Sequence, residues 1–393
     1  MKFETKAIRI QADRSAHREH SAPIFPTSSF IYEDAEQMRA LFAGEMQGNI
    51  YSRFTNPNFR EFEQKMAALE LSDDAVCTAS GMAAVTAGFL SFLKKGDHLL
   101  ASRALFGSTY SLLTNHLPKW GIESTFVDPR DLDSWKEHVR PNTKMLYIES
   151  PSNPGLEVID LAFAGQFCRE HGLIYNVDNC FATPYLQQPA HFGADLIIHS
   201  ATKFIDGQGR VLGGVVAGKQ AYVDEVRKFC RSTGPSLSPF NAWLLSKSLE
   251  TLAVRMDRHC DNALGLANWL KEQPSIAAVN YPFLPDHPAY EIAKKQMKKG
   301  GGIVTFELAG GLEQGRCFLD NVQLCSLSAN LGDTRTIVTH PASTTHAKLT
   351  EEQRLEVGIT NGLIRVSVGL EHLDDLMSDI GQALQKSKEL KLQ

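Results

Sequence analysis

The sequence predicts an α/β protein with a mostly parallel central sheet, helices on both faces of that sheet, and a smaller C-terminal α/β domain. Short apolar runs of strand length alternate with helical stretches over most of the first 250 residues. Such alternation favours parallel strands joined by crossover helices. Past residue 271 the strand candidates become fewer. With 393 residues, of which 43% are hydrophobic, the chain can also bury a large core in more than one domain.

Residues 1–56 are expected to form an irregular arm. Pro23 and Pro26 interrupt any regular spacing of apolar residues, yet the same segment holds Phe25 and Tyr51 among other aromatic residues. An irregular segment with many aromatic side chains is typical of a surface that lies against something. That surface is either the body of the same chain or a partner subunit.

The regular pattern begins at Asn56 and Pro57, because an N-cap residue followed by proline is typical of a helix start. The strand candidates that follow are the apolar runs at 75–78, 98–101, 125–127, 145–148, 173–177, 196–199 and 214–217. The helices between them include 161–171, which ends at Gly172, a residue type common at helix ends. We assign residues 57–250 to this domain.

A long helical stretch from about 238 to 271 leads into the C-terminal part of the chain. The strand candidates there are 303–308 and 364–368, with helices near 314–319 and 376–384. We assign residues 251–393 to this smaller α/β domain.

Composition and charge argue against several classes of protein. Lys and Arg total 40 against 45 Asp and Glu, and this net charge of −5 disfavours a general nucleic-acid binder. No apolar run is long enough for a membrane-spanning helix, and the first residues lack a signal-peptide core. The 7 cysteines are scattered without a CxxC pair, and His340 and His346 have no nearby ligand pattern. We therefore expect a cytoplasmic globular protein without a metal site.

Polar residues follow several predicted strands, at the edge where open α/β sheets bind ligands. Ser80 and Gly81 follow the first strand and run into a helix, whose first amide groups could hold a phosphate. Asp178 follows the strand at 173–177. Because Asp178 precedes Lys203 by one strand–helix–strand step, we expect the two side chains on neighbouring loops.

An anion cradle, an acid and a lysine at one rim are the parts that pyridoxal 5'-phosphate requires. A lysine forms a Schiff base with this cofactor, and an acid keeps the pyridine nitrogen protonated so that the ring accepts electrons. The candidate phosphate ligands are Gly81, Met82, Ser200 and Thr202. Taken singly, each feature has an ordinary interpretation, since an aspartate at a strand end is usually a turn or cap residue. Their joint placement is what favours a cofactor site.

Six strings of residues resemble the Cys/Met-metabolism family of pyridoxal-phosphate enzymes, which have the type I fold of PLP-dependent transferases. The strings are YSRFTNP at 51–57, ASGMAA at 79–84, DNCFATP at 178–184, HSATK at 199–203, HPASTTH at 340–346 and LIRVSVG at 363–369. The resemblance covers about residues 21–384. It implies pyridoxal 5'-phosphate as cofactor, a small amino-acid substrate, and a homodimer that commonly pairs into a homotetramer.

The resemblance assigns the cofactor residues one by one. Lys203 would carry the cofactor and shuttle protons, and Asp178 would pair with the pyridine nitrogen. The phosphate would be held by Gly81, Met82, Ser200 and Thr202. Tyr51 and Arg53 would reach the phosphate bound in the neighbouring subunit, so a complete site would need the dimer.

The substrate residues follow from the same resemblance. Asn153 would lie beside the phenolic oxygen of the cofactor and close to the substrate. Arg365 would bind the substrate α-carboxylate, a task that suits a planar guanidinium able to make two parallel hydrogen bonds. Asn330 stands near that carboxylate, where relatives often have serine.

Within the family, the strings at 203–210, 234–243 and 330–334 are most similar to O-succinylhomoserine sulfhydrylases. This similarity implies replacement of the succinyl group by sulfide, giving homocysteine and succinate in methionine biosynthesis. The alternatives are a cystathionine γ-synthase, with cysteine as nucleophile, and a methionine γ-lyase. A catalytically silent metabolite-binding protein on the same fold is a further alternative, which the intact lysine, acid and arginine disfavour.

Two departures from the family pattern disfavour a methionine γ-lyase. Phe106 stands where such enzymes have a ring-stacking tyrosine, and Ser108 stands where they have a cysteine. Phe106 can still stack on the cofactor ring, but it has no hydroxyl to donate a proton. Tyr110 would either compensate for the missing hydroxyl or pack on its helix with Leu113 and Leu117.

Overall fold

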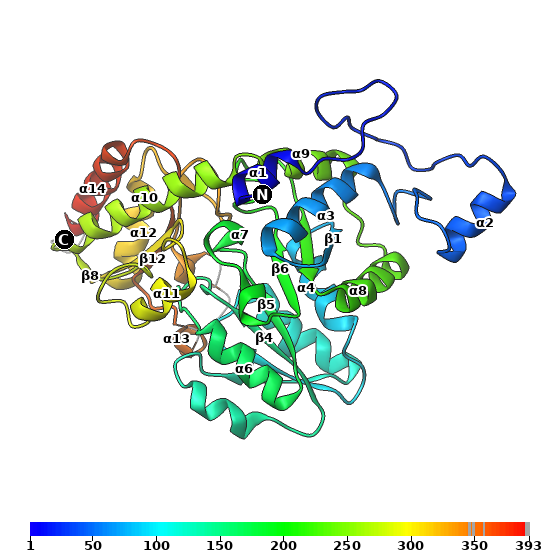
Figure 1. Ribbon diagram of the computed structural model, residues 1–393. Coiled ribbons are helices and arrows are strands. Elements are labelled where there is room, and N and C mark those ends of the chain that lie inside the picture. Colours follow the sequence, from blue (N-terminus) through cyan, green and yellow to red (C-terminus); the bar gives the residue numbers. More distant parts are fainter. Residues whose placement is uncertain (345–346, 348–349, 357, 390–393) are drawn as a thin grey trace.

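Two sheets organise the chain in the computed structural model, which describes residues 1–344, 347, 350–356 and 358–389 (Figure 1). The seven-stranded sheet has the order β1-β7-β6-β5-β4-β2-β3, and the five-stranded sheet has the order β10-β11-β12-β9-β8. The first occupies the cyan and green part of Figure 1, and the second the yellow and orange part. Thr345 and His346 of the HPASTTH string lie outside the described residues.

The large sheet is mostly parallel, as predicted. Its strands are β1 (Asp74–Thr78), β2 (His98–Ser102), β3 (Glu123–Val127), β4 (Thr143–Glu149), β5 (Ile174–Asp178), β6 (Leu196–Ser200) and β7 (Gly214–Gly218). β7 runs antiparallel to both of its neighbours, β1 and β6, while the remaining pairs are parallel. Most of these strands are buried along their length because helices cover both faces.

Local signals in the sequence set the ends of the covering helices. These are α3 (Pro57–Glu70), α4 (Gly81–Leu90), α5 (Gly107–Ser111), α6 (Leu161–His171), α7 (Thr183–Leu186) and α8 (Gln220–Thr233). The side chain of Asn56 caps α3 by accepting from the backbone N–H of Asn58 at 2.9 Å. Gly172 ends α6 with a φ of 65°, the left-handed conformation that favours glycine. Short helical turns complete this part: η1 (Leu112–His116), η2 (Leu117–Trp120), η3 (Leu132–His138) and η4 (Pro189–Phe192).

The small sheet contains two strands that the sequence predicts and three that it does not. The predicted strands are β9 (Ile303–Leu308) and β12 (Leu363–Ser367), and the others are β8 (Ile276–Asn280), β10 (Ser326–Leu327) and β11 (Ile337–Thr339). β12 pairs antiparallel with β9 on one side and β11 on the other. The remaining elements here are α11 (Tyr290–Gln296), α12 (Gly311–Asn321), η5 (Pro341–Ser343), α13 (Glu351–Glu356) and α14 (Leu373–Glu389).

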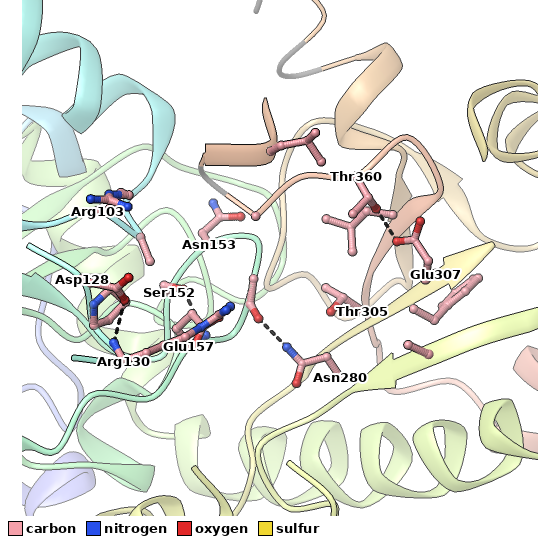
Figure 2. A pocket seen from close by; sticks show the side chains of 18 residues that line it. Arg103, Asp128, Arg130, Ser152, Asn153, Glu157, Asn280, Thr305, Glu307 and Thr360 are labelled. Carbon is pink, nitrogen blue, oxygen red and sulfur yellow. Dashed lines mark hydrogen bonds and ion pairs between the residues drawn. The ribbon is translucent and has the colours of Figure 1, made fainter. Parts of the chain in front are cut away.

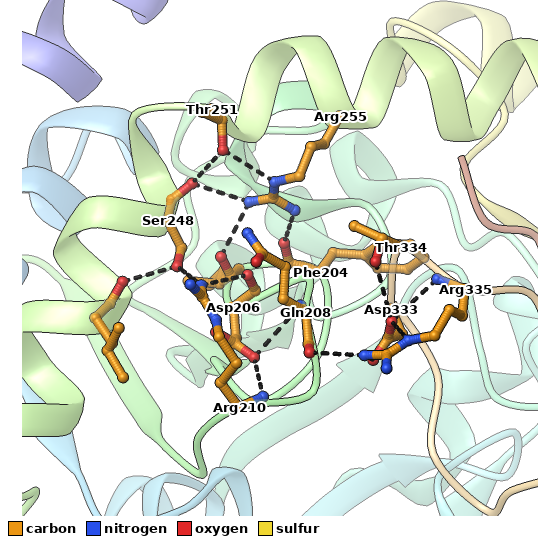
Figure 3. Close-up of polar contacts among 12 residues, drawn as sticks. Phe204, Asp206, Gln208, Arg210, Ser248, Thr251, Arg255, Asp333, Thr334 and Arg335 are labelled. Carbon is orange, nitrogen blue, oxygen red and sulfur yellow. Dashed lines mark hydrogen bonds and ion pairs between the residues drawn. The ribbon is translucent and has the colours of Figure 1, made fainter. Parts of the chain in front are cut away.

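The predicted helical stretch at 238–271 is two helices, α9 (Pro239–Leu249) and α10 (Leu252–Lys271). The break has a physical cause, shown in Figure 3: the carbonyl of Ser248, near the end of α9, accepts from the guanidinium of Arg255 at 2.9 Å. The hydroxyl of Thr251 donates to the same carbonyl at 3.2 Å. Arg255 also donates to the carbonyl of Phe204 at 2.6 Å and so fixes the loop that follows Lys203.

The arm contains two helices, α1 (Phe3–Arg9) and α2 (Ala35–Ala43), rather than being irregular throughout. α1 packs on the body, whereas α2 projects away from it at the right of Figure 1. Large apolar side chains of this part are exposed, with Ile31 98% and Phe42 57% accessible. The limits of the arm and of the two domains stay predictions. Among the described residues, no helix is both long and apolar enough to cross a membrane.

Candidate active site

Lys203 and Arg365 are connected through one residue, Asn330. Lys203 lies on the loop after β6, and its Nζ donates to Oδ1 of Asn330 at 2.5 Å. The backbone oxygen of the same Asn330 accepts from Nη2 of Arg365 at 3.1 Å. Burial lowers the pKa of the Lys203 amine, and the positive charge of Arg365 lowers it further. The structure thus brings the predicted cofactor lysine and the predicted carboxylate-binding arginine into one polar cluster.

Arg365 is a buried cation on β12, with 4% of its surface exposed. Its Nη1 donates to Oδ1 of Asn153 at 3.0 Å, and its Nη2 donates to the hydroxyl of Thr339 at 3.3 Å. Within the described residues, its Nε has no hydrogen-bond partner. Burial lowers the pKa of the guanidinium to about 10, so Arg365 stays charged at neutral pH. A charged guanidinium with spare donor capacity and no carboxylate partner among these contacts suits a substrate carboxylate.

Asp178 ends β5, which pairs with β6, the strand that leads to Lys203. Its Oδ2 accepts from the hydroxyl of Tyr147 at 3.1 Å, and its Oδ1 accepts from the backbone N–H of Cys180 at 3.0 Å. Burial raises the pKa of the carboxyl group, and these hydrogen bonds oppose that rise. A buried carboxylate of this kind is stabilised by a neighbouring cation, such as a protonated pyridine.

The predicted phosphate ligands lie where the start of α4 meets the end of β6. Ser80 caps α4 by accepting from the N–H of Ala83 at 3.1 Å, and the first amides of the helix have no partners within the helix. A Cβ on Gly81 would lie 2.6 Å from Cβ of Ser200, so only glycine allows this close approach. The hydroxyl of Thr202 accepts from the N–H of Gly213 at 3.1 Å. Together with Lys203 and Asp178, this cradle fits pyridoxal 5'-phosphate.

Glu149 is a residue of this site to which sequence reasoning assigned no role. It ends β4 in register with Asp178 of β5, and it is 4% exposed. Its two carboxyl oxygens accept from the backbone N–H groups of Phe106 and Asn153, each at 2.8 Å. Burial, followed by the charge of Asp178, raises the pKa of Glu149 well above its ordinary value. Glu149 therefore joins the loop that carries Phe106 to the loop that carries Asn153.

Phe106 stands at the start of α5 with 41% of its surface exposed. Tyr110, one turn further on, stacks on Phe126, with ring centroids 4.9 Å apart and an interplanar angle of 22°. The Tyr110 ring therefore packs against β3, and whether Tyr110 also replaces the missing hydroxyl of Phe106 stays a prediction.

Tyr51 and Arg53 lie on the arm, apart from the cluster around Lys203. The guanidinium of Arg53 lies 4.3 Å from the ring centroid of Phe54, and it donates to the backbone oxygen of Arg231 at the end of α8. In the described part of the chain, no hydrogen bond or ring contact joins Tyr51 or Arg53 to Lys203. Their role in a neighbouring subunit stays a prediction.

No group of three or more His, Cys, Asp or Glu side chains among the described residues is arranged to hold a metal ion. His340 is bonded on both ring nitrogens, to the hydroxyl of Ser343 and to the backbone oxygen of Asn361, each at 2.8 Å. These contacts give His340 a structural role at the end of β11.

Comparison with known proteins gives the family. Residues 4–385 match the family of Cys/Met metabolism PLP-dependent enzymes. The chain belongs to this family. Pyridoxal 5'-phosphate is therefore the cofactor, and the fold is that of the type I PLP-dependent enzymes.

Individual relatives carry different activities. The chain is 48% identical over 382 residues to O-succinylhomoserine sulfhydrylase of Pseudomonas aeruginosa, covering 97% of this chain and 95% of that protein. It is 41% identical over 385 residues to L-methionine gamma-lyase of Porphyromonas gingivalis, covering 97% and 96%. Among solved structures, a putative O-acetylhomoserine (thiol)-lyase of Campylobacter jejuni with N'-pyridoxyl-lysine-5'-monophosphate is similar with a TM-score of 0.95 at 35% identity, covering 98% of this chain and 100% of that chain.

Proposed function

We propose that this Cys/Met metabolism enzyme replaces the acyloxy group of O-succinylhomoserine by sulfide, giving homocysteine and succinate. The observation that carries the amino-acid chemistry is the bridge through Asn330, which brings Lys203 and Arg365 together. The choice of the sulfhydrylase is supported by the relative at 48% identity and by Phe106, which lacks the hydroxyl of the lyase-type tyrosine.

In this proposal the small sheet binds the substrate. Arg365 pairs with the α-carboxylate of the substrate through its guanidinium, and Asn153 fixes the guanidinium in place. The hydroxyl of Thr339 holds the other end of that guanidinium. This arrangement presents the amino group and Cα of the substrate to the rim of the large sheet.

Lys203 moves the protons. Because burial and the charge of Arg365 lower its pKa, its amine is more readily neutral and can take the proton from Cα. One amine holds one such proton at a time, so Lys203 passes the first proton to the bound cofactor before it takes one from Cβ. Bound pyridoxal 5'-phosphate supplies the electron sink for the negative charge at Cα, and Asp178 balances the positive charge of the ring. The acyloxy group then leaves from Cγ as a carboxylate, and hydrosulfide forms the new bond at Cγ. Lys203 returns the two protons to Cβ and Cα.

Two other activities are the alternatives. Methionine γ-lyase is the activity of a relative at 41% identity, and it would release methanethiol from methionine. A cystathionine γ-synthase would use the same residues with cysteine in place of sulfide.

The proposal is tested by measuring homocysteine formation by the purified holoenzyme from O-succinylhomoserine and sulfide. O-acetylhomoserine, cysteine and methionine serve as parallel substrates. Rapid homocysteine formation that depends on both the succinyl ester and sulfide is the expected result. Cystathionine from cysteine, or ketobutyrate from methionine alone, would replace the proposal with the synthase or the lyase.

We also propose that the enzyme acts as a homodimer, further paired into a homotetramer. The exposed apolar arm supports this, because Ile31 and Phe42 have large uncovered surfaces in the single chain. Sedimentation velocity of the holoenzyme tests the assembly, and a monomer with full activity would contradict it.

A further inference from the structure

A cavity of about 420 Å³ lies between the loops of the large sheet and the small sheet, next to the polar cluster of Lys203, Asn330 and Arg365 (Figure 2). One wall comes from the loops that follow β4, β2 and β3 of the large sheet, and the other wall comes from β8 and β9 of the small sheet together with residues near Thr360. Asn153 lines this cavity and also binds Arg365. The cavity therefore adjoins the place where the substrate carboxylate is expected.

Polar residues of the small-sheet wall lie in one cross-strand row with Arg365. Thr305 of β9 is in register with Arg365 of β12 on one side and with Asn280 of β8 on the other. Thr305 is 1% exposed, and within the described residues its hydroxyl has no hydrogen-bond partner. Because the hydroxyl oxygen itself is inaccessible, Thr305 shapes this wall of the cavity and offers no open hydrogen-bonding group to a ligand.

Most of the other charged groups of the cavity are already bonded within it. Arg130 pairs with Glu157, to which its Nε donates at 3.1 Å. Glu307 accepts from the hydroxyl of Thr360, and Asp128 accepts from the backbone N–H of Arg130 at 2.9 Å.

Arg103 is the exception among the cations that line this cavity. It follows β2 on the loop that leads to Phe106, and it makes no ion pair with any described carboxylate. Figure 2 shows Arg103 on the large-sheet side, opposite Thr305 and Glu307. The cavity thus offers one uncommitted cation beside the expected substrate-carboxylate site.

We propose that this cavity binds the acyl group of the substrate, with Arg103 pairing with the free carboxylate of a succinyl ester. This inference rests on the proposed function and adds the basis of acyl-group selection. A dicarboxylic monoester satisfies both Arg103 and Arg365, one at each end of the substrate. An acetyl ester is neutral at its acyl end and leaves Arg103 without a partner, so the cavity adds less to its binding free energy.

The test compares kcat/KM of the holoenzyme for O-succinylhomoserine and O-acetylhomoserine, with sulfide saturating. We expect Arg103→Gln to lower the value for the succinyl ester about 10- to 100-fold while changing that for the acetyl ester by less than about threefold, as expected for loss of a charge-assisted pair. Arg103→Lys should restore part of the loss. Arg130→Gln is the matched control, because Arg130 lines the same cavity but is already paired with Glu157. In this variant the ratio of kcat/KM for the succinyl ester to that for the acetyl ester should stay within about twofold of the parent.

A second measurement separates this inference from the proposed function. Titration of succinate into the holoenzyme by calorimetry should give binding that weakens about tenfold or more in Arg103→Gln and is unchanged in Arg130→Gln. If the parent forms no homocysteine from either ester while succinate still binds through Arg103, the proposed function is wrong and the anion site stands. Three results would overturn the inference. The first is an equal loss of kcat/KM for both esters in Arg103→Gln, and the second is an equal loss in Arg130→Gln. The third is succinate binding of the same affinity in Arg103→Gln and the parent.

Discussion

On the large-sheet wall of the active site, the carboxylates are bonded within the large sheet and its loops, whereas the polar groups of the small-sheet wall bond both within their own side and across to the other. On the large-sheet wall, Asp178 accepts from Tyr147 and Cys180, and Glu149 accepts from Phe106 and Asn153. On the small-sheet wall, Arg365 and Asn330 bond to each other, and each also makes one bond to the other side, through Asn153 and Lys203.

This difference between the walls predicts different effects of substitutions on each. The cofactor groups around Lys203 and Asp178 all lie at the large sheet, because the start of α4, the end of β6 and the loop with Lys203 adjoin it. Substitutions there should change cofactor binding or the chemical step. The substrate groups depend on contacts that cross between the sheets, so substitutions there should change KM with the cofactor retained.

The largest expected effect is that of Lys203→Ala. Without the amine, the cofactor loses its covalent attachment and the proton at Cα loses its acceptor, so turnover should fall at least about 10³-fold. The absorption band of the lysine-bound cofactor should disappear as well. Lys144→Ala, an exposed lysine of β4, is the control and should leave both unchanged. An enzyme that keeps the band and the turnover without Lys203 would remove that residue from the mechanism.

The sequence predicted the residues of the cradle because they are marked locally. Ser80 is an N-cap before an apolar helix, and Asp178 and Lys203 each follow a buried strand, so strand order alone places them on neighbouring loops. The sheet of the first domain was predicted as mostly parallel for the same reason. The antiparallel direction of β7 could not be predicted, since the run at 214–218 has the same pattern in either direction.

Residues whose role depends on contacts between distant parts of the chain had no such local sequence signal. Glu149 gains its role from two backbone N–H groups brought to it by other loops, and Thr305 gains its place from its register beside Arg365. β8 is an edge strand with partly exposed residues, and its positions 276–279 are all apolar. α2 is likewise marked locally, because Asp34 caps its start and Gly44 ends it with a φ of 74°. Both elements therefore have sequence signals, although neither is among the predicted elements.

The second-largest expected effect is that of Asp178→Asn, which tests the chemical role of the large-sheet wall. An amide cannot balance a protonated ring as a carboxylate does, so kcat should fall about 10²- to 10³-fold while the cofactor stays bound. Exchange of the Cα proton with deuterated solvent should slow by a similar factor. The exposed Asp133→Asn serves as control. A variant as fast as the parent would exclude Asp178 from proton abstraction.

Arg365→Lys addresses the small-sheet wall. Lysine keeps the charge but lacks the planar pair of donors that reaches Asn153 and the substrate together, so KM should rise about 10- to 100-fold. Cofactor affinity should change little, because Arg365 is not part of the cradle. Steady-state kinetics and a cofactor titration measure the two quantities, with the exposed Arg316→Lys as control. Loss of the cofactor with KM unchanged would show that Arg365 serves the cofactor rather than the substrate, contrary to the division between the two walls.

The smallest expected effect is that of Glu149→Gln. Glutamine has one acceptor oxygen, and its NH2 group would face the backbone N–H of either Phe106 or Asn153, so one of the two 2.8 Å bonds is lost. Loss of one such bond at a buried carboxyl should weaken cofactor binding about tenfold and alter the circular dichroism of the bound cofactor. The exposed Glu137→Gln should leave both unchanged. If Glu149→Gln instead raises KM and keeps the cofactor affinity of the parent, Glu149 belongs functionally with the substrate groups, and the two walls are less separate than their hydrogen bonds indicate.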